Sequence, residues 1–227
     1  MSDYRERLPS ADKARAMTHE QMRQMILQHA RQFFFHQGYR SVTTRQVADA
    51  CGLTQPSLYH YFSNKETLYV AVIQEEIART HSGLVRILQR DAPLPERIRH
   101  ITRYLLTTTE QDHTLMLYDV HNELSAAGQA TLREAFATGL VAPLTALFDM
   151  GQQTYQFRTP ANGGIDAATT AGLLLTLISY FLRAPIPGTS AIDRRVPGRA
   201  QEIADQITHL MLEGLAISNS TQSETPT

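Results

Sequence analysis

Apolar residues recur every three or four positions along most of the chain, which is the period of an α-helix. Met22, Ile26, Ala30 and Phe33 mark one such stripe and predict a helix over residues 18–37. No segment of convincing length alternates with the strand period of two, so we expect an all-α protein. Pro143 should kink or break the helix that contains it. The other expected helices span residues 66–88, 95–110, 112–127, 129–154, 165–183 and 198–217.

The stretch from Thr43 to Lys65 predicts two short helices joined by a turn. Thr43 and Gln46 have the spacing of a capping box, so a helix should begin there. Gly52 follows the last apolar residue of that helix, where a positive φ is often required. Leu53 then supplies an apolar residue between the two helices.

The second short helix is expected over residues 55–62. Thr54 can cap it, and Pro56 falls in its first turn, where a missing N–H is tolerated. Leu58 and Phe62 are four positions apart and should both face inward. The pattern is typical of a helix-turn-helix, although an ordinary helical hairpin fits the periodicity equally well.

The order GYRSVTTRQVADACGLTQPSLYHYFSNKETL, residues 38–68, closely resembles the DNA-binding domain of the tetracycline-repressor (TetR/AcrR) family of bacterial transcriptional regulators. The resemblance covers about residues 18–72. The rest of the chain matches only in length and in all-helical character. The residues that carry the likeness are Gly38, Tyr39, Thr43, Ala48, Gly52, residues 58–62, Lys65, Glu66 and Leu68.

The resemblance implies a homodimeric, ligand-responsive repressor that leaves a pseudo-palindromic operator when a small molecule binds. Activation or corepression stays open. Gln55 and Ser57, early in the reading helix, should meet base edges, and glutamine favours the paired donor and acceptor of adenine. Thr54, just before them, is also expected to contact DNA. The positions that resemble the phosphate contacts of the family are Thr43, Thr44, Arg45, Tyr59, His60 and Lys65.

The domains are expected to follow from this likeness. A flexible arm (1–17) would precede a DNA-binding domain (18–72), an effector-binding and dimerisation domain (73–217) and a disordered tail (218–227). Residues 1–65 hold nine Lys or Arg and five Asp or Glu, a balance of +4, whereas the remainder has a balance of −5. A basic end suits a DNA reader. The arm either reaches phosphates or the minor groove, or is simply solvated.

The composition indicates the cellular compartment in which we expect the protein. Cys51 is the single cysteine of 227 residues, which excludes an internal disulfide and suits a reducing cytoplasm. The charged start of the sequence is unlike a signal peptide. The most apolar run, residues 167–184, contains several Thr and Ser and is short for a bilayer, so we expect a buried helix rather than a membrane span.

Two further sites follow from the later helices. The last two expected helices, residues 165–183 and 198–217, are unusually apolar, and the resemblance implies that they form the dimer interface. An apolar or aromatic effector could lie between helices, although residues of this kind are more often part of a plain core. These candidates are Tyr104, Met116, Tyr118, His121, Phe136, Phe148, Tyr155 and Tyr180.

Neither metal nor catalytic chemistry is indicated. Asp119 and Glu123 can share a helix face, but His121 lies away from both, so we expect a solvated acidic face and no metal. Phosphate-loop, zinc-helix and nucleophile-elbow motifs are missing from the sequence, so we expect no cofactor and no enzyme activity. The alternative is an all-α small-molecule-binding protein or enzyme whose helix-turn-helix is incidental.

Overall fold

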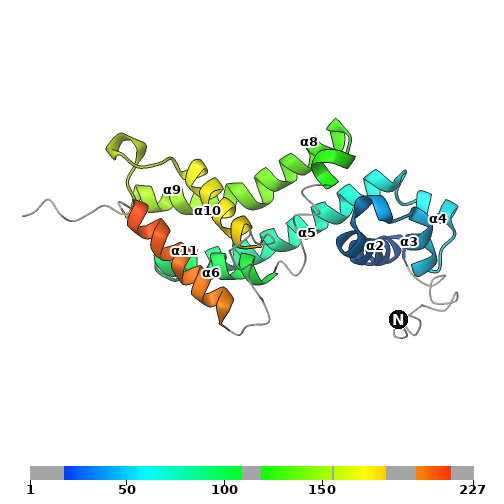
Figure 1. Ribbon diagram of the computed structural model, residues 1–227, viewed down its shortest axis with the longest axis horizontal. Helices are drawn as coiled ribbons and strands as arrows, with labels where there is room; N and C mark the ends of the chain where they lie inside the picture. The colour runs from blue at the N-terminus through cyan, green and yellow to red at the C-terminus, as the bar shows by residue number, and fades with distance from the viewer. Residues whose placement is uncertain (1–17, 109–118, 155, 183–197, 216–227) are drawn as a thin grey trace, which may run out of the picture. The chain divides into compact units, whose positions relative to one another are not determined.

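The computed structural model describes residues 18–108, 119–154, 156–182 and 198–215. All secondary-structure elements in these ranges are helices (Figure 1). The all-α prediction is therefore confirmed for this part of the chain. None of the described helices is both long enough and apolar enough to cross a membrane. The expected N-terminal arm and C-terminal tail lie outside the described residues.

The chain divides into two compact units. The first comprises residues 1–77 and 111–135, and the second comprises residues 78–110 and 136–227. This division rests on packing, so the assignment of functional domains with a boundary near Ile73 remains a prediction. One feature was not expected: residues 119–135, far along the sequence, belong to the unit that holds the helix-turn-helix.

The helices of the first unit begin and end largely as their residues dictate. Thr18 and Gln21 form a capping box at the start of the first helix. Gly38 has a φ of 77° and interrupts that helix where the prediction placed its end. The elements are α2 (His19–Ser41), α3 (Thr44–Ala50), α4 (Gln55–Tyr59), the first part of α5 (Lys65–Leu88) and nearly all of α8 (Ala126–Phe136).

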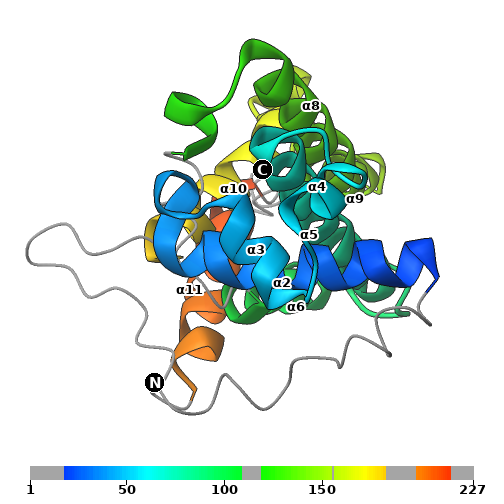
Figure 2. The ribbon, with the colours of Figure 1, turned by 90° about the vertical axis from the view of Figure 1, so that its right-hand side faces the viewer.

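The core of the first unit joins these helices. Helices α2, α3 and α4 lie side by side in both views (Figures 1 and 2). Tyr69 from α5 packs edge-on against Phe34, with ring centroids 4.8 Å apart. Leu124 and Leu132 are buried in the same cluster, so the segment around α8 is part of this core.

The second unit contains α6 (Leu94–Thr108), α9 (Ala142–Gln153), α10 (Ala167–Leu182) and α11 (Arg199–Leu215). In it α6 packs against α11, and α9 packs against α10. The helix expected over residues 129–154 is interrupted by a π-helical turn, Ala137–Val141. Pro143 has no N–H to donate to the carbonyl of Gly139, and the Nδ1 atom of His81 lies 2.9 Å from that oxygen instead.

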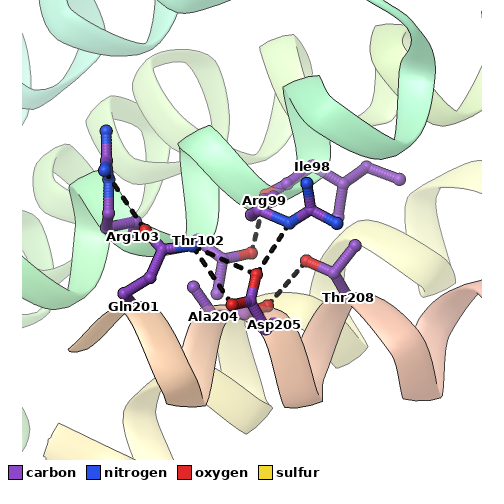
Figure 3. Close-up of polar contacts among 8 residues, drawn as sticks. All are labelled: Ile98, Arg99, Thr102, Arg103, Gln201, Ala204, Asp205 and Thr208. Carbon is purple, nitrogen blue, oxygen red and sulfur yellow. Dashed lines mark hydrogen bonds and ion pairs between the residues drawn. The ribbon is translucent and has the colours of Figure 1, made fainter. Parts of the chain in front are cut away.

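Polar contacts between α6 and α11 lie at the surface of the second unit (Figure 3). The Nε atom of Arg99 lies 2.7 Å from Oδ1 of Asp205, and Arg103 donates to Oε1 of Gln201 at 3.2 Å. The side chains of Arg99 and Asp205 are 40% and 49% exposed. Solvent therefore screens this pair, and it contributes little to stability.

Candidate nucleic-acid interface

The turn between α3 and α4 forms as the sequence predicts. The Thr43 hydroxyl accepts the N–H of Gln46 at 3.2 Å, and the Thr43 N–H donates to the Gln46 side chain at 2.7 Å. Gly52 takes a φ of 67°. The N–H of Leu53 then donates to the carbonyl of Ala48 at 2.9 Å, which closes the turn. The capping box and the glycine turn are both confirmed.

Helix α4 begins as predicted but ends earlier. The Thr54 hydroxyl accepts the N–H of Ser57 at 3.3 Å, as expected for a helix cap. Regular helix stops before the predicted end at Phe62, and His60 already forms its C-terminal cap. The N–H of Phe62 still donates to the carbonyl of Leu58 at 3.1 Å, so both apolar side chains point inward.

The underside of this pair of helices is core, and its outer side is open. Val47, Cys51, Leu58 and Phe62 are buried, and burial raises the pKa of the Cys51 thiol to about 12, so it stays protonated. Tyr59 is 43% exposed, His60 is exposed, and Gln55 and Ser57 are half-buried. We call these four residues, Gln55, Ser57, Tyr59 and His60, the reading ridge.

Three polar side chains form a closed cluster at the start of the ridge. The amide nitrogen of Gln55 donates to the Thr44 hydroxyl at 2.9 Å and to the Tyr59 hydroxyl at 3.2 Å. The two hydroxyls are themselves 3.2 Å apart. Hydrogen bonds from Thr44 and then Gln55 lower the pKa of the Tyr59 phenol from its ordinary value. The cluster joins α3 to α4.

The predicted phosphate-contacting residues do not share one environment. Thr43 and Arg45 are exposed beside the ridge, as is the cap residue Thr54. Lys65 is half-buried, its Nζ lies 4.3 Å from the centroid of the Tyr39 ring, and it donates to the Arg40 carbonyl at 3.3 Å. Burial lowers the pKa of the Lys65 ammonium, against the opposing effect of nearby carboxylates. Lys65 therefore also has a packing role.

The expected solvated acidic face at residues 119–123 is wrong for its carboxylates. Asp119 is only 3% exposed, and its Oδ2 accepts the N–H of Tyr39 at 2.7 Å and the hydroxyl of Tyr69 at 3.3 Å. The Tyr39 N–H directly follows the positive φ of Gly38, where the helix ladder is interrupted. Burial, and then the charge of Asp119, raise the pKa of Tyr69, so its hydroxyl remains a donor.

Neighbouring residues extend this contact, which we call the carboxylate junction. The side chain of Glu123 is 11% exposed, and its Oε1 lies 2.7 Å from Nε of Arg40. That oxygen has no directed hydrogen-bond partner among the described residues, so the contact between Arg40 and Glu123 is ionic. The same holds for Nε of Arg99 and its contact with Asp205 in the second unit. Glu66 accepts the N–H of Ser125 at 3.1 Å. His121 is exposed. No group of three metal-ligating side chains occurs in the described ranges.

The candidate effector residues are dispersed. Phe148 is fully buried against Phe157, and half-buried Tyr104 lies so close to Gly83 that a Cβ atom there would be 2.0 Å from its hydroxyl oxygen. Phe136 and Tyr180 are 41% and 46% exposed. The candidates Tyr104, Phe136, Phe148 and Tyr180 belong to the second unit, whereas the exposed His121 belongs to the first. Met116, Tyr118 and Tyr155 lie outside the described residues. The effector site stays a prediction.

Comparison with solved structures agrees with this fold. The structure of AibR in complex with isovaleryl coenzyme A and operator DNA aligns with a TM-score of 0.62 and 21% sequence identity. The alignment covers 85% of this chain and 99% of that one. At this identity the likeness establishes the architecture alone.

Comparison of sequences finds transcriptional regulators. The transcriptional repressor AcnR of Corynebacterium glutamicum is 35% identical over 80 residues, which is 33% of this chain and 43% of AcnR. The transcriptional activator FasR of Mycolicibacterium smegmatis is 26% identical over 148 residues, 63% of this chain and 67% of FasR. The chain thus matches less than half the length of AcnR.

The family model described as bacterial regulatory proteins, tetR family, matches residues 26–72. These residues run from the middle of α2 through α3 and α4 into α5, and they include the whole reading ridge. With this match and the AcnR likeness, residues 26–72 are identified as the DNA-binding segment of the tetR family of bacterial regulatory proteins.

Proposed function

We propose that this protein is a DNA-binding transcriptional regulator, a repressor that a small molecule releases from a pseudo-palindromic operator. The observation that carries the proposal is the reading ridge, which is held from below by buried apolar residues and is open on its outer side. The AcnR likeness supports a repressor over an activator, because that repressor is 35% identical in its matched stretch and the activator FasR is 26% identical. We propose no catalytic role.

The side chains divide into two roles in this proposal. Gln55 and Ser57 meet base edges in the major groove, as residues at the start of a reading helix do. The other contacts go to phosphates and fix the register of the protein on the duplex. They come from Thr43, Thr44, Arg45, Tyr59, His60 and Lys65, and Thr54 also contacts the DNA.

We propose that the protein acts in the cytoplasm as a homodimer formed through α10 and α11. Large apolar side chains on these helices remain exposed in one chain: Leu173 is 43% exposed, Tyr180 46% and Leu210 58%. A second copy would cover them and pair two reading ridges about one DNA turn apart. Sedimentation should find a species of twice 25.5 kDa at micromolar concentration, and a monomer alone would contradict the dimer.

The effector is proposed to bind between helices of the second unit, around aromatic residues such as Tyr104 and Phe148. AibR was solved with isovaleryl coenzyme A, so short acyl-coenzyme A thioesters join apolar aromatic compounds in the panel to be tested. A ligand selective for the native state, at 100 times its Kd, raises the free energy of unfolding by about 2.7 kcal/mol, which thermal-shift measurements detect.

The direct test is selection of bound duplexes from a random-sequence library by the purified full-length chain, followed by gel retardation at two salt concentrations. We expect selective retardation that weakens as salt rises. Arg45→Ala should weaken binding to all duplexes alike and reduce the salt slope by about one. Retention of no sequence above the background of the library would refute the regulator and favour an incidental helix-turn-helix.

A further inference from the structure

The polar cluster of Thr44, Gln55 and Tyr59 leads to an inference that rests on the proposed DNA-binding function. We propose that these side chains form one preassembled reading group. In this group Thr44 and Tyr59 are positioning residues that turn the amide of Gln55 so that its carbonyl oxygen, Oε1, meets the base. The specificity of the protein at this base pair then depends on three residues rather than one.

The count of hydrogen-bond donors supports this arrangement. The amide nitrogen of Gln55 is turned toward both hydroxyls, and it donates to Thr44 at 2.9 Å and to Tyr59 at 3.2 Å. One hydroxyl hydrogen is used between Thr44 and Tyr59, whose oxygens are 3.2 Å apart. The polar groups that the cluster itself does not use are Oε1 of Gln55 and one hydroxyl hydrogen. The cluster therefore offers a carbonyl acceptor to a base.

Geometry makes the cluster a unit rather than a chance contact. Thr44 is the first residue of α3, whereas Gln55 begins α4 and Tyr59 ends it one helical turn later. The hydrogen bonds therefore cross from α3 to α4 and tie both positions to the same supporting core. The Ser57 hydroxyl is held differently, 2.8 Å from the Thr54 hydroxyl at the helix cap. Gln55 is thus the ridge residue whose side-chain carbonyl oxygen, Oε1, is oriented by hydrogen bonds to Thr44 and Tyr59.

This arrangement predicts a different base preference from a glutamine that binds freely. A free amide pairs with both N6 and N7 of adenine. With its amide nitrogen turned toward the two hydroxyls, Gln55 presents Oε1 to the base, accepts from the exocyclic amine of adenine or cytosine and makes no bond to N7. Guanine and thymine present carbonyl oxygens there and are disfavoured. We therefore expect Gln55 to discriminate bases that carry an exocyclic amine from bases that carry a carbonyl oxygen, rather than to select adenine alone.

Base analogues test this point in the duplex selected by the wild-type chain, at the base pair whose preference Gln55→Ala relaxes. With adenine at that position, 7-deazaadenine removes N7 and should leave the Kd unchanged within about twofold. Unsubstituted purine removes the 6-amino group and should weaken binding about two- to tenfold, the effect of one hydrogen bond. A comparable loss with 7-deazaadenine would show two-atom adenine recognition and overturn the inference.

Variants of the positioning residues give the second test. Thr44→Val and Tyr59→Phe should each reduce amine-over-carbonyl discrimination at the Gln55 base pair, and the double variant should lose little more than either alone. Thr44→Ser keeps the hydroxyl and should retain discrimination. Equal weakening on all duplexes with a smaller salt slope would assign Thr44 and Tyr59 to phosphates only and refute the inference. A wild-type chain that selects no duplex refutes the proposed function itself.

Discussion

The two units place aspartate side chains in opposite settings. In the first unit, Asp119 is 3% exposed and accepts two hydrogen bonds from residues far away in the sequence. In the second, Asp205 is 49% exposed, and its contact with Arg99 joins two helices that already pack through apolar residues. Distance alone does not rank such contacts. Burial decides which of them the fold depends on.

The apolar residues of the second unit show the same division between inside and outside. Leu174 is fully buried, whereas its neighbour Leu173 is 43% exposed. Leu174→Ala should lower the free energy of unfolding by about 2–5 kcal/mol in urea titrations, because it leaves a cavity. Leu173→Ala should change the stability of an isolated chain little but shift sedimentation toward the monomer. Equal loss of stability in both variants, with no change in assembly, would contradict the proposed dimer face.

The contrast between the two aspartates can be measured directly. Asp119→Ala leaves the partly buried N–H of Tyr39 without its acceptor and should cost about 1–3 kcal/mol of unfolding free energy. Asp205→Ala removes a screened surface pair and should cost less than about 1 kcal/mol. Asp119→Asn keeps an acceptor and should recover part of the loss. A larger effect at Asp205 than at Asp119 would invert our ranking of the two contacts.

The smallest predicted effect is a pH dependence in the first unit. Burial lowers the pKa of His29 below its ordinary value of 6.5, so the unfolded chain takes up the proton at higher pH than the folded chain. The stability from neutral His29 is complete above pH 6.5 and declines as the pH falls from there toward the folded-state pKa. Thermal unfolding at pH 8 and pH 5.5 should show a small loss that His29→Leu reduces. An undiminished loss would exclude His29 as its source.

The sequence predicts local structure well where one residue determines it. The caps at Thr43 and Thr54, the positive φ at Gly52 and the break before Pro143 each follow from the chemistry of nearby residues. The inward positions of α4 also follow from spacing. These features place the reading ridge and its support without any knowledge of long-range contacts.

The carboxylate junction could not be predicted in this way. Asp119 and Tyr39 are 80 positions apart, and helical spacing says nothing about which distant backbone N–H lacks a partner. One hint was present: Asp119 stands in the apolar run LMLYDV, an unusual setting for a solvated face. The Gln55 cluster was also missed, because the prediction treated each ridge residue as an independent contact.

The central claim is that the reading ridge recognises bases in duplex DNA, and Gln55→Ala tests it most directly. Binding should be measured against every single-base variant of a duplex selected by the wild-type chain. We predict a loss on the order of 1–3 kcal/mol, with preference relaxed at one base pair per half-site and kept elsewhere. Unchanged preference at every position would contradict the claim, whatever the change in overall affinity.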